Sequence, residues 1–178
     1  MDEAAFDTLF RDNAPRVYAY ARRHIAADQC EDVVSETFLQ AWRRRADVPA
    51  DPLPWLLVTA RHTIANRTRG QRRADRLWQE AVAAYWHMPT AAAPDELVAE
   101  RDSLIEALAT CSPAEREALL LISWDGLSYD AAADVLGCTP RARTVRVSRG
   151  RARLTAYLQA DGDRPATAPT LTLAQETS

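Results

Sequence analysis

The feature that most constrains the fold lies at residues 126–154, where a short apolar segment, a glycine turn and a strongly basic segment follow one another. Ser128 can cap a helix, because its hydroxyl accepts a hydrogen bond from a first-turn N–H group. Gly137 suits the left-handed residue that often ends a helix. Thr139 and Pro140 suit the start of the next helix, since Pro at the first position forfeits no hydrogen bond. The pattern predicts a helix-turn-helix, whose second helix enters the major groove of DNA.

The second segment of this stretch carries six arginines with no acidic residue among them, namely Arg141, Arg143, Arg146, Arg149, Arg151 and Arg153. Like charges on one short helix repel each other, so such a helix is favoured beside a polyanion. The plainer alternative is a helical hairpin with a solvated arginine face, because arginine is also a good helix former. The density of unpaired positive charge favours nucleic acid.

Composition favours an all-α chain. It has 178 residues, an apolar fraction of 47% and only five glycines, which is enough for one average domain or two small ones with a buried core. The formal net charge of −3 argues against a protein that coats DNA by itself. Arginine is nevertheless concentrated at 61–76 and 141–153, while acidic residues gather in the first fifty residues and around 95–117. That separation suits a chain that touches DNA with some faces and a protein with others.

The cysteines, the N-terminus and the lack of catalytic motifs argue against several classes of protein. Three cysteines that are far apart and lack a CxxC spacing indicate neither a disulfide framework nor a zinc site, and they suit a reducing compartment. The acidic N-terminus does not read as a signal peptide, and no apolar run approaches the length of a membrane span. We find no phosphate-binding loop, metal-ligand cluster or Ser/His/Asp setting. We therefore expect a cytoplasmic protein that is not an enzyme, without catalytic residues, metal, cofactor or membrane insertion.

Hydrophobic periodicity predicts three helices in the first part of the chain. They are expected at residues 3–27, from residue 28 or 29 to about 45, and from residue 54 or 55 into the arginines that follow. Pro15 is expected to kink or split the first helix, because proline lacks the N–H group that a helix interior needs. Asp28 is expected to cap the second.

The later part of the chain divides at a change of composition. Residues 77–95 are rich in small residues and proline near their end, which is typical of a linker. Ser112 opens a Ser-Pro-Ala-Glu capping box, so a helix is expected to start there. We divide the chain into a first domain at 1–76, a flexible linker at 77–95, a second domain at 96–159 and a disordered tail at 160–178.

The third predicted helix combines Trp55, His62 and Asn66 with a run of arginines at Arg67, Arg69, Arg72 and Arg73. Aromatic and amide groups can stack on or hydrogen-bond to exposed bases, while arginine follows phosphates. Taken singly, each residue has a plainer explanation, with Trp55 in the core, His62 on a helix surface and Asn66 at a helix end. The basic run after an apolar helix is as compatible with a solvated helix tail as with a second nucleic-acid face.

Three segments together resemble the extracytoplasmic-function sigma factors of bacterial RNA polymerase. They are CEDVVSETFLQAW at 30–42, PWLLVTARHTIAN at 54–66 and the helix-turn-helix at 126–154, in the order and spacing of that family. The resemblance implies two small helical domains, the second a helix-turn-helix of the winged-helix-like, sigma region 4 type. It implies that the protein binds core RNA polymerase, directs it to promoter DNA and helps to melt the duplex, with an anti-sigma protein as a further partner.

The resemblance also implies roles for particular residues. Core polymerase would be contacted by Asp32, Glu36, Thr37 and Gln40, with Phe38 and Trp42 internal. The minus-ten element would be read and melted, with an unpaired base held near Asn66, by Arg61, His62, Asn66, Arg67, Arg69, Arg72 and Arg73. The minus-thirty-five element would be read as a duplex by Arg141, Thr144, Val145, Arg146, Ser148 and Arg149.

The helix-turn-helix departs from the family pattern in ways that affect its packing. An ungapped match puts Arg143 where the family has a buried valine. Either the register shifts towards Thr144 and Val145, or the helix packs differently. Ala131 and Ala132 stand where an acidic residue and an isoleucine are usual, which predicts lighter packing.

The alternative function is a regulator that binds DNA without polymerase, through the helix-turn-helix, with the first domain as a sensor or dimerisation domain. It predicts tight duplex binding with a steep dependence on salt. The acidic net charge counts against this alternative.

Overall fold

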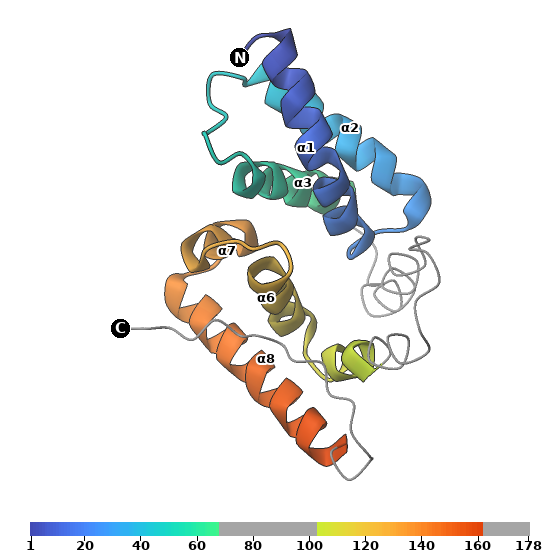
Figure 1. Cartoon of the computed structure of the whole chain (residues 1–178), viewed down its shortest axis with the longest axis vertical. Coiled ribbons are helices and arrows are strands. Elements are labelled where there is room, and N and C mark those ends of the chain that lie inside the picture. Colours follow the sequence, from blue (N-terminus) through green and yellow to red (C-terminus); the bar gives the residue numbers. More distant parts are fainter. Residues whose placement is uncertain (68–102, 162–178) are drawn as a thin grey trace.

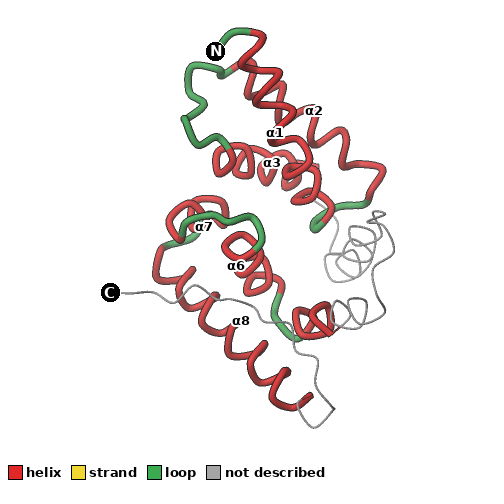
Figure 2. The backbone as a smooth tube through the Cα atoms, viewed as in Figure 1, coloured by secondary structure: helices red, strands yellow, loops and turns green. Residues whose placement is uncertain are grey.

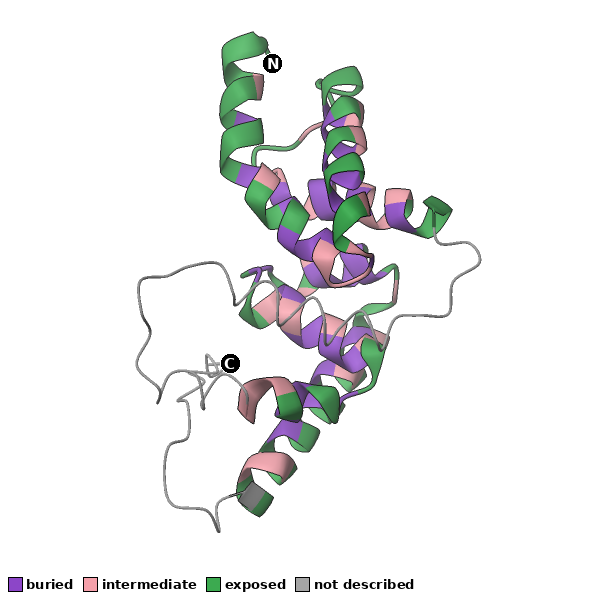
Figure 3. Cartoon of the chain, turned by 90° about the vertical axis from the view of Figure 1, so that its right-hand side faces the viewer, coloured by how far each residue is buried: buried purple, intermediate pink, exposed green. Residues whose placement is uncertain are grey.

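The computed structural model describes residues 1–67 and 103–161, which form two helical domains that lie against each other (Figure 1). No strand occurs in these two described ranges (Figure 2), and the all-α class is confirmed. Buried residues line the facing sides of the helices, while exposed residues cover their outer sides (Figure 3). The predicted linker, and the tail beyond Asp161, lie outside the described residues.

The first domain consists of α1 (Glu3–Arg22), α2 (Ala27–Arg43) and α3 (Leu53–Arg67), and each of these helices packs against the other two. Asp2 caps α1, with its carboxylate accepting a hydrogen bond from the N–H of Ala5 at 2.9 Å. Apolar side chains at helical spacing form the core. Its fully or almost fully buried members include Val17, Tyr20, Ile25, Val33, Phe38, Leu56 and Leu57.

Helix boundaries in the first domain differ from the predictions. α1 ends at Arg22 instead of residue 27, and it runs through Pro15 without a break. The buried residues Leu9 and Val17 anchor the helix on both sides of the proline, so packing offsets the hydrogen bond that proline cannot donate. Asp28 does not cap α2, because it lies in the first turn. There its carboxylate still faces the positive end of the helix dipole.

The second domain begins with helical residues at 103–109 and continues with α6 (Pro113–Ser123), α7 (Tyr129–Leu136) and α8 (Pro140–Asp161). The predicted capping box is present at the start of α6. The Glu115 carboxylate accepts from the N–H of Ser112 at 2.9 Å, and the N–H of Glu115 donates to the Ser112 hydroxyl at 3.4 Å. Reciprocal bonds of this kind satisfy N–H groups that a helix start leaves without partners.

The predicted turn between α7 and α8 is also confirmed. Ser128 caps α7, and Gly137 ends it with a φ of 59°, in the left-handed region. The Thr139 hydroxyl accepts from the N–H of Ala142 at 3.2 Å, and Pro140 is the first residue of α8. Cys138 lies in this turn and is partly exposed. α8 continues past residue 159, where the second domain was expected to end.

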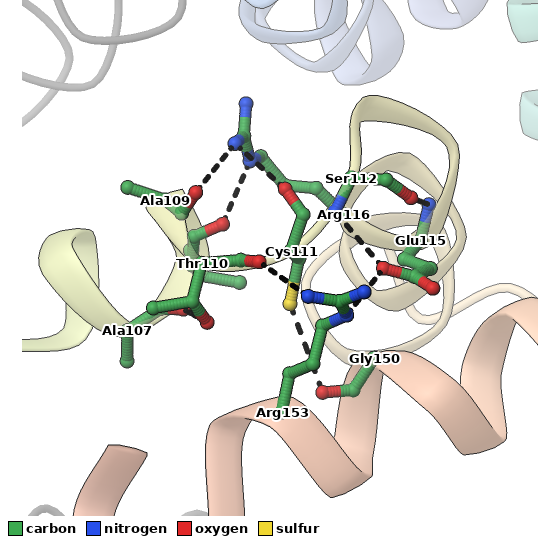
Figure 4. A network of polar contacts seen from close by, with 10 residues as sticks. Ala107, Ala109, Thr110, Cys111, Ser112, Glu115, Arg116, Gly150 and Arg153 are labelled. Carbon is green, nitrogen blue, oxygen red and sulfur yellow. Dashed lines mark hydrogen bonds and ion pairs between the residues drawn. The ribbon is translucent and has the colours of Figure 1, made fainter. Parts of the chain in front are cut away.

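A buried guanidinium organises the start of the second domain (Figure 4). Arg116 of α6 donates to the carbonyl oxygens of Leu108 at 2.9 Å, Ala109 at 3.4 Å and Cys111 at 3.0 Å. These carbonyls lie at the end of the helical segment 103–109, where a helix leaves its last C=O groups without intrahelical partners. Arg116 therefore satisfies that helix end from a neighbouring helix.

α8 crosses α6 at Gly150, where a side chain would have no room. A Cβ atom on Gly150 would lie 2.7 Å from Cδ1 of Leu119. The buried thiol of Cys111 donates to the carbonyl oxygen of Gly150 at 3.7 Å, and Arg153 pairs with Glu115 at 3.2 Å. These contacts fix α8 against α6 and set the direction in which the basic helix leaves the domain.

Candidate nucleic-acid and partner interfaces

α2 presents a polar strip along one side. Asp32, Glu36 and Gln40 are spaced by four residues, which places them on one helix face. Asp32 is exposed and the other two are half-buried, and the Gln40 amide donates to the Glu36 carboxylate at 2.8 Å. Thr37 is fully buried, and its hydroxyl donates to the carbonyl oxygen of Val33 at 2.7 Å. A buried side chain cannot contact a partner, so the structure contradicts the role predicted for Thr37.

Two apolar residues of α2 are also exposed to solvent. Leu39 is 40% exposed and Trp42 is 38% exposed, so the prediction that Trp42 is internal was wrong. Its ring packs edge-on against Phe6 at 5.0 Å between centroids, and the guanidinium of Arg45 lies over the ring, 5.4 Å from its centroid. The sequence carries a signal of this, because apolar residues at 38, 39, 41 and 42 occupy more of the helix circumference than one buried face can take.

A groove of about 440 Å³ runs between α2 and α3. Its lining joins residues from two of the predicted groups, namely Glu36, Gln40, Arg44, Trp55, Thr59, His62, Thr63, Asn66 and Arg67. An ion pair of 3.0 Å between Arg67 and Asp32 bridges the two helices beside it. The groove therefore places an indole, an imidazole, two amides and two guanidinium groups around one space.

Arg61 does not share this groove. Each residue step turns an α-helix by about 100°, and Arg61 lies on the side of α3 that faces the second domain. There its guanidinium pairs with the carboxylate of Glu117. The structure thus brings His62, Asn66 and Arg67 together and separates Arg61 from them. Arg69, Arg72 and Arg73 lie outside the described residues.

The outer face of α8 carries the residues predicted to read duplex DNA. Arg141, Thr144, Ser148 and Arg149 are exposed, Val145 is 41% exposed, and Arg146 is half-buried. Thr144 is partly engaged, because its hydroxyl donates to the carbonyl oxygen of Pro140 at 3.0 Å. The face combines cationic, hydroxyl and methyl groups, which are the groups that contact phosphates and base edges in a major groove.

Arg143 settles how the helix-turn-helix packs. The residue is 8% exposed, so it occupies a buried position without a register shift. Its guanidinium lies over the ring of Tyr129, 4.9 Å from the centroid, and one nitrogen is 3.7 Å from the carboxylate of Asp130. Cation–π contact and a weak ion pair replace the apolar packing that a valine would make. The helix therefore keeps its register and packs differently, which was the second of the two predicted alternatives.

The prediction of six unpaired arginines on α8 was wrong for three of them. Arg143 is buried against Tyr129, Arg151 donates to the hydroxyl of Tyr129 at 2.8 Å, and Arg153 pairs with Glu115. These three tie α8 to α7 and α6. The positive charge left for an external polyanion is that of Arg141, Arg146 and Arg149.

Within residues 1–67 and 103–161, no group of three or more His, Cys, Asp and Glu side chains is placed to hold a metal ion. None of the helices in those ranges combines the length and the apolar character that crossing a bilayer requires.

Two family models match the chain, one in each domain. The model described as Sigma-70 region 2 matches residues 9–74. The model described as Sigma-70, region 4 matches residues 101–154. The first match includes α2, α3 and the groove between them, and the second includes the helix-turn-helix.

Characterised relatives and solved structures resemble the chain over most of its length. It is 31% identical to the RNA polymerase sigma factor CarQ of Myxococcus xanthus, over 84% of this chain and 87% of that protein. It is 31% identical to the ECF RNA polymerase sigma factor EcfG of Rhodopseudomonas palustris, over 76% and 75%. The sigma factor RpoE, solved in complex with the anti-sigma factor NepR from Bartonella quintana, superposes with a TM-score of 0.60 at 27% identity, over 88% of this chain and 98% of RpoE. CnrH, solved with the cytosolic domain of CnrY, gives a TM-score of 0.59 at 28% identity, over 90% and 91%.

Proposed function

We propose that separate faces of this chain, which belongs to the sigma-70 family and, within it, to the extracytoplasmic-function sigma factors, bind core polymerase and the two promoter elements. The protein directs the initiation of transcription by binding core RNA polymerase and promoter DNA. Sigma factors act as initiation factors and are generally not enzymes, and we assign this chain no catalytic step. Its place of action is then the cytoplasm, with the polymerase.

The exposed side of α2 binds core polymerase in this proposal. Asp32, Glu36 and Gln40 supply charge and hydrogen bonds, and the adjoining Leu39 and Trp42 supply apolar area. A large aromatic side chain that is 38% exposed beside polar groups is typical of a protein interface. RpoE was solved with the anti-sigma factor NepR, and CnrH with the cytosolic domain of CnrY. We infer from the first of these that an anti-sigma protein is a partner of this chain as well.

The groove between α2 and α3 takes the minus-ten element. An unpaired base can stack on an aromatic side chain and form hydrogen bonds with neighbouring polar groups. Trp55, His62 and Asn66 all line the groove, and Arg67 lies at the same end of α3 as Asn66. Unpairing a base is costly, so a groove that stabilises only the correct base couples melting to recognition.

α8 reads the minus-thirty-five element. Among the exposed residues of its outer face, Arg149 can make the bidentate contact with guanine, and Val145 can contact the methyl group of thymine. Arg141 and Arg146 contact phosphates and add affinity without sequence preference.

The observation that carries this proposal is the separation of two chemically distinct faces, a groove with aromatic and amide groups on α3 and a cationic outer face on α8. The test is run-off transcription by reconstituted holoenzyme on promoter libraries randomised in one element at a time. Asn66→Ala should relax the preference at the minus-ten element alone. Arg149→Ala should relax one position of the minus-thirty-five element, at a cost in discrimination of about 1–3 kcal/mol.

Two further variants complete the test. Trp42→Ala should weaken binding to core polymerase while leaving the promoter preference intact. Arg11→Ala, an exposed arginine of α1 outside all the assigned faces, is the matched control and should change neither. A wild-type chain that binds promoter duplex tightly but does not bind core polymerase would refute the assignment and favour the stand-alone regulator.

A further inference from the structure

Thr144 is exposed on the outer face of α8, but its hydroxyl group is already engaged both as a donor and as an acceptor. The hydroxyl donates to the carbonyl oxygen of Pro140 at 3.0 Å, and it accepts from Nη2 of Arg143 at 3.2 Å. A threonine hydroxyl has one proton and two acceptor lone pairs. The proton of Thr144 is therefore committed to the backbone of α8, and none is left for an acceptor on a base edge.

The bond from Arg143 decides how the side chain of Thr144 is turned. Within a helix, threonine divides between two rotamers, because its hydroxyl can bond to the carbonyl oxygens of the preceding turn. The bond to Pro140 is of this kind, so it does not by itself select one rotamer. The guanidinium of Arg143 supplies a second fixed point for the hydroxyl. The direction of the methyl group of Thr144 is then fixed as well.

Arg143 can supply this fixed point because its own position is fixed. The residue is 8% exposed, its guanidinium lies over the ring of Tyr129 at 4.9 Å, and Nη1 is 3.7 Å from the carboxylate of Asp130. Arg151 holds Tyr129 in turn, by donating to its hydroxyl at 2.8 Å. Ordering a long side chain costs conformational entropy, and the packing of α8 on α7 has already ordered this one. The contact between the two helices thus sets the orientation of Thr144.

Stability alone gives little reason for burying the guanidinium of Arg143. Its Nε and Nη1 atoms are buried with no hydrogen-bond partner in the part of the chain that the structure describes. Unmet donors of a buried charge are costly, and an apolar side chain would avoid that cost. The family pattern has a valine at this position, and a valine cannot donate a hydrogen bond. What Arg143 adds towards the outer face of α8 is its bond to Thr144.

One lone pair and the methyl group of Thr144 remain for a base edge. Thymine is the base that presents a methyl group in the major groove, and a threonine methyl group is among its apolar partners. The next residue, Val145, is 41% exposed and adds further apolar area beside Thr144. This part of the outer face therefore suits a thymine, which presents no hydrogen-bond donor in the major groove.

We propose that Thr144 reads a thymine of the minus-thirty-five element through its methyl group, and that Arg143 is the positioning residue that holds the hydroxyl aside. The proposal deepens the proposed function and rests on it, because it requires α8 to lie in the major groove. The preference for one base pair comes from contact between two methyl groups. That preference depends on Arg143, although Arg143 itself does not touch the DNA.

The first test removes one methyl group at a time, from the protein and from the DNA. Wild-type holoenzyme selects its minus-thirty-five element from a randomised promoter library, and each thymine is then replaced by deoxyuridine, which lacks only the methyl group. At one position this replacement should weaken binding of the wild type and of Thr144→Val about four-fold, the value expected for one buried methyl group. Thr144→Ser should bind the thymine promoter about four-fold more weakly and should not distinguish the two bases there.

The second test separates positioning from a purely structural role. Arg143→Met should lose most of the discrimination between thymine and deoxyuridine, because the hydroxyl of Thr144 loses its second partner. Arg143→Met/Thr144→Val should regain the discrimination, since valine in a helix strongly prefers one rotamer and has no hydroxyl to hold. Thr155→Val and Thr155→Ser change an exposed threonine nearer the C-terminal end of α8. They are the matched controls and should keep the wild-type discrimination. Circular dichroism checks that each variant keeps its helices.

Several results would overturn the proposal. One is a selected element in which no replacement of thymine by deoxyuridine weakens wild-type binding, or in which Thr144→Ser keeps the sensitivity at every position. Another is loss of the discrimination in Thr144→Val, because the hydroxyl would then be the group that reads the base. An Arg143→Met variant with wild-type discrimination, or one that Thr144→Val does not rescue, would overturn the role of Arg143. Failure of the proposed function would be distinguishable, because the wild-type holoenzyme would then select no minus-thirty-five sequence from the library.

Discussion

The two domains bury polar side chains of different kinds. In the first domain the buried polar residues are neutral, and each bonds to its own helix one turn back. Asn13 donates to the carbonyl oxygen of Leu9 at 3.0 Å, and Thr37 donates to that of Val33 at 2.7 Å. In the second domain the buried polar residues are all charged, namely Glu115, Arg116, Asp125 and Arg143.

This difference indicates two ways of stabilising a small helical domain. A neutral side chain bonded within its own turn adds little between helices, so large aliphatic and aromatic residues hold the first domain together. The second domain also buries large aliphatic residues, including Leu119, Leu121, Val135 and Val147, and it buries charged residues among them. It ties its helices together through buried charges that need complete partner sets. We therefore expect that substituting a buried charge with a full set of partners, such as Arg116, costs much more than substituting a buried neutral residue of the first domain.

The largest contrast is expected between Arg116→Met and Asn13→Leu. Arg116→Met removes three hydrogen bonds, although the carbonyl oxygen of Leu108 keeps the N–H of Cys111 as a donor, and it should lower the free energy of unfolding by about 3–5 kcal/mol. Asn13→Leu removes one neutral bond, at a cost of about 1 kcal/mol. Chemical denaturation gives the two values, and hydrogen exchange of the α6–α8 amides shows which domain is affected. Equal losses in the two variants would contradict the comparison.

A second contrast concerns the histidine at the contact between the domains. Burial lowers the pKa of His24 to about 4, with Arg23 and Arg61 acting in the same direction and Glu117 opposing them. The side chain is 25% exposed, but its Nε2 atom is shielded from solvent. The unfolded chain takes up a proton below about pH 6.5, whereas the folded chain stays neutral until about pH 4. Stability is therefore complete above pH 6.5 and is lost as the pH falls towards 4.

The expected loss from this residue is about 2 kcal/mol between pH 7.5 and pH 5. Urea denaturation at the two pH values measures it. His24→Gln should reduce the loss by that amount, while the exposed His62→Gln should leave it unchanged. The same pH dependence in both variants would show that His24 is not the group responsible.

A third test examines the close crossing of α6 and α8. Gly150→Ala should lower stability by about 1–2 kcal/mol, because its Cβ would lie 2.7 Å from Cδ1 of Leu119, which is buried. In a Leu119→Ala background the same substitution should raise stability by up to about 1 kcal/mol, since alanine favours a helix more than glycine does. Thermal denaturation of the four chains gives both values. If Gly150→Ala lowers stability in the Leu119→Ala background as well, the close crossing of the two helices is not the cause of the loss.

The smallest effect is expected at Arg143, whose Nε and Nη1 atoms are buried with no hydrogen-bond partner among the described residues. An apolar residue of similar length recovers the cost of burying that charge. Arg143→Met should therefore leave stability within about 1 kcal/mol of the wild type, and Arg143→Val, of the family type, should do the same. A loss above 2 kcal/mol in both variants would show that the contact with Tyr129 is essential.

Local signals in the sequence predicted the local structure well. Ser128, Gly137, Thr139 and the capping box at Ser112 act within four residues of themselves, and each behaves in the structure as predicted. The resemblance placed the buried position at Arg143, because a family pattern carries the register of a helix. Both kinds of information are contained in a short window of the chain.

The features that could not be predicted depend on residues far apart in the sequence. Helical periodicity shows which residues share a face, but it does not show what lies opposite that face. Arg61 was therefore grouped with its neighbour His62, although the structure pairs it with Glu117. Thr37 was misassigned for another reason, since a small hydroxyl that bonds to its own backbone can be buried at little cost.

The turn between α7 and α8 has a practical consequence for attaching a fluorescent label to the protein. Of the three thiols in the chain, Cys30 and Cys111 are buried, and burial raises the pKa of each. A maleimide dye reacts with accessible thiolate, so the native protein should be labelled selectively at the partly exposed Cys138. That position lies beside the first turn of α8. A fluorophore there would report on promoter engagement in the natural sequence, with no cysteine added or removed.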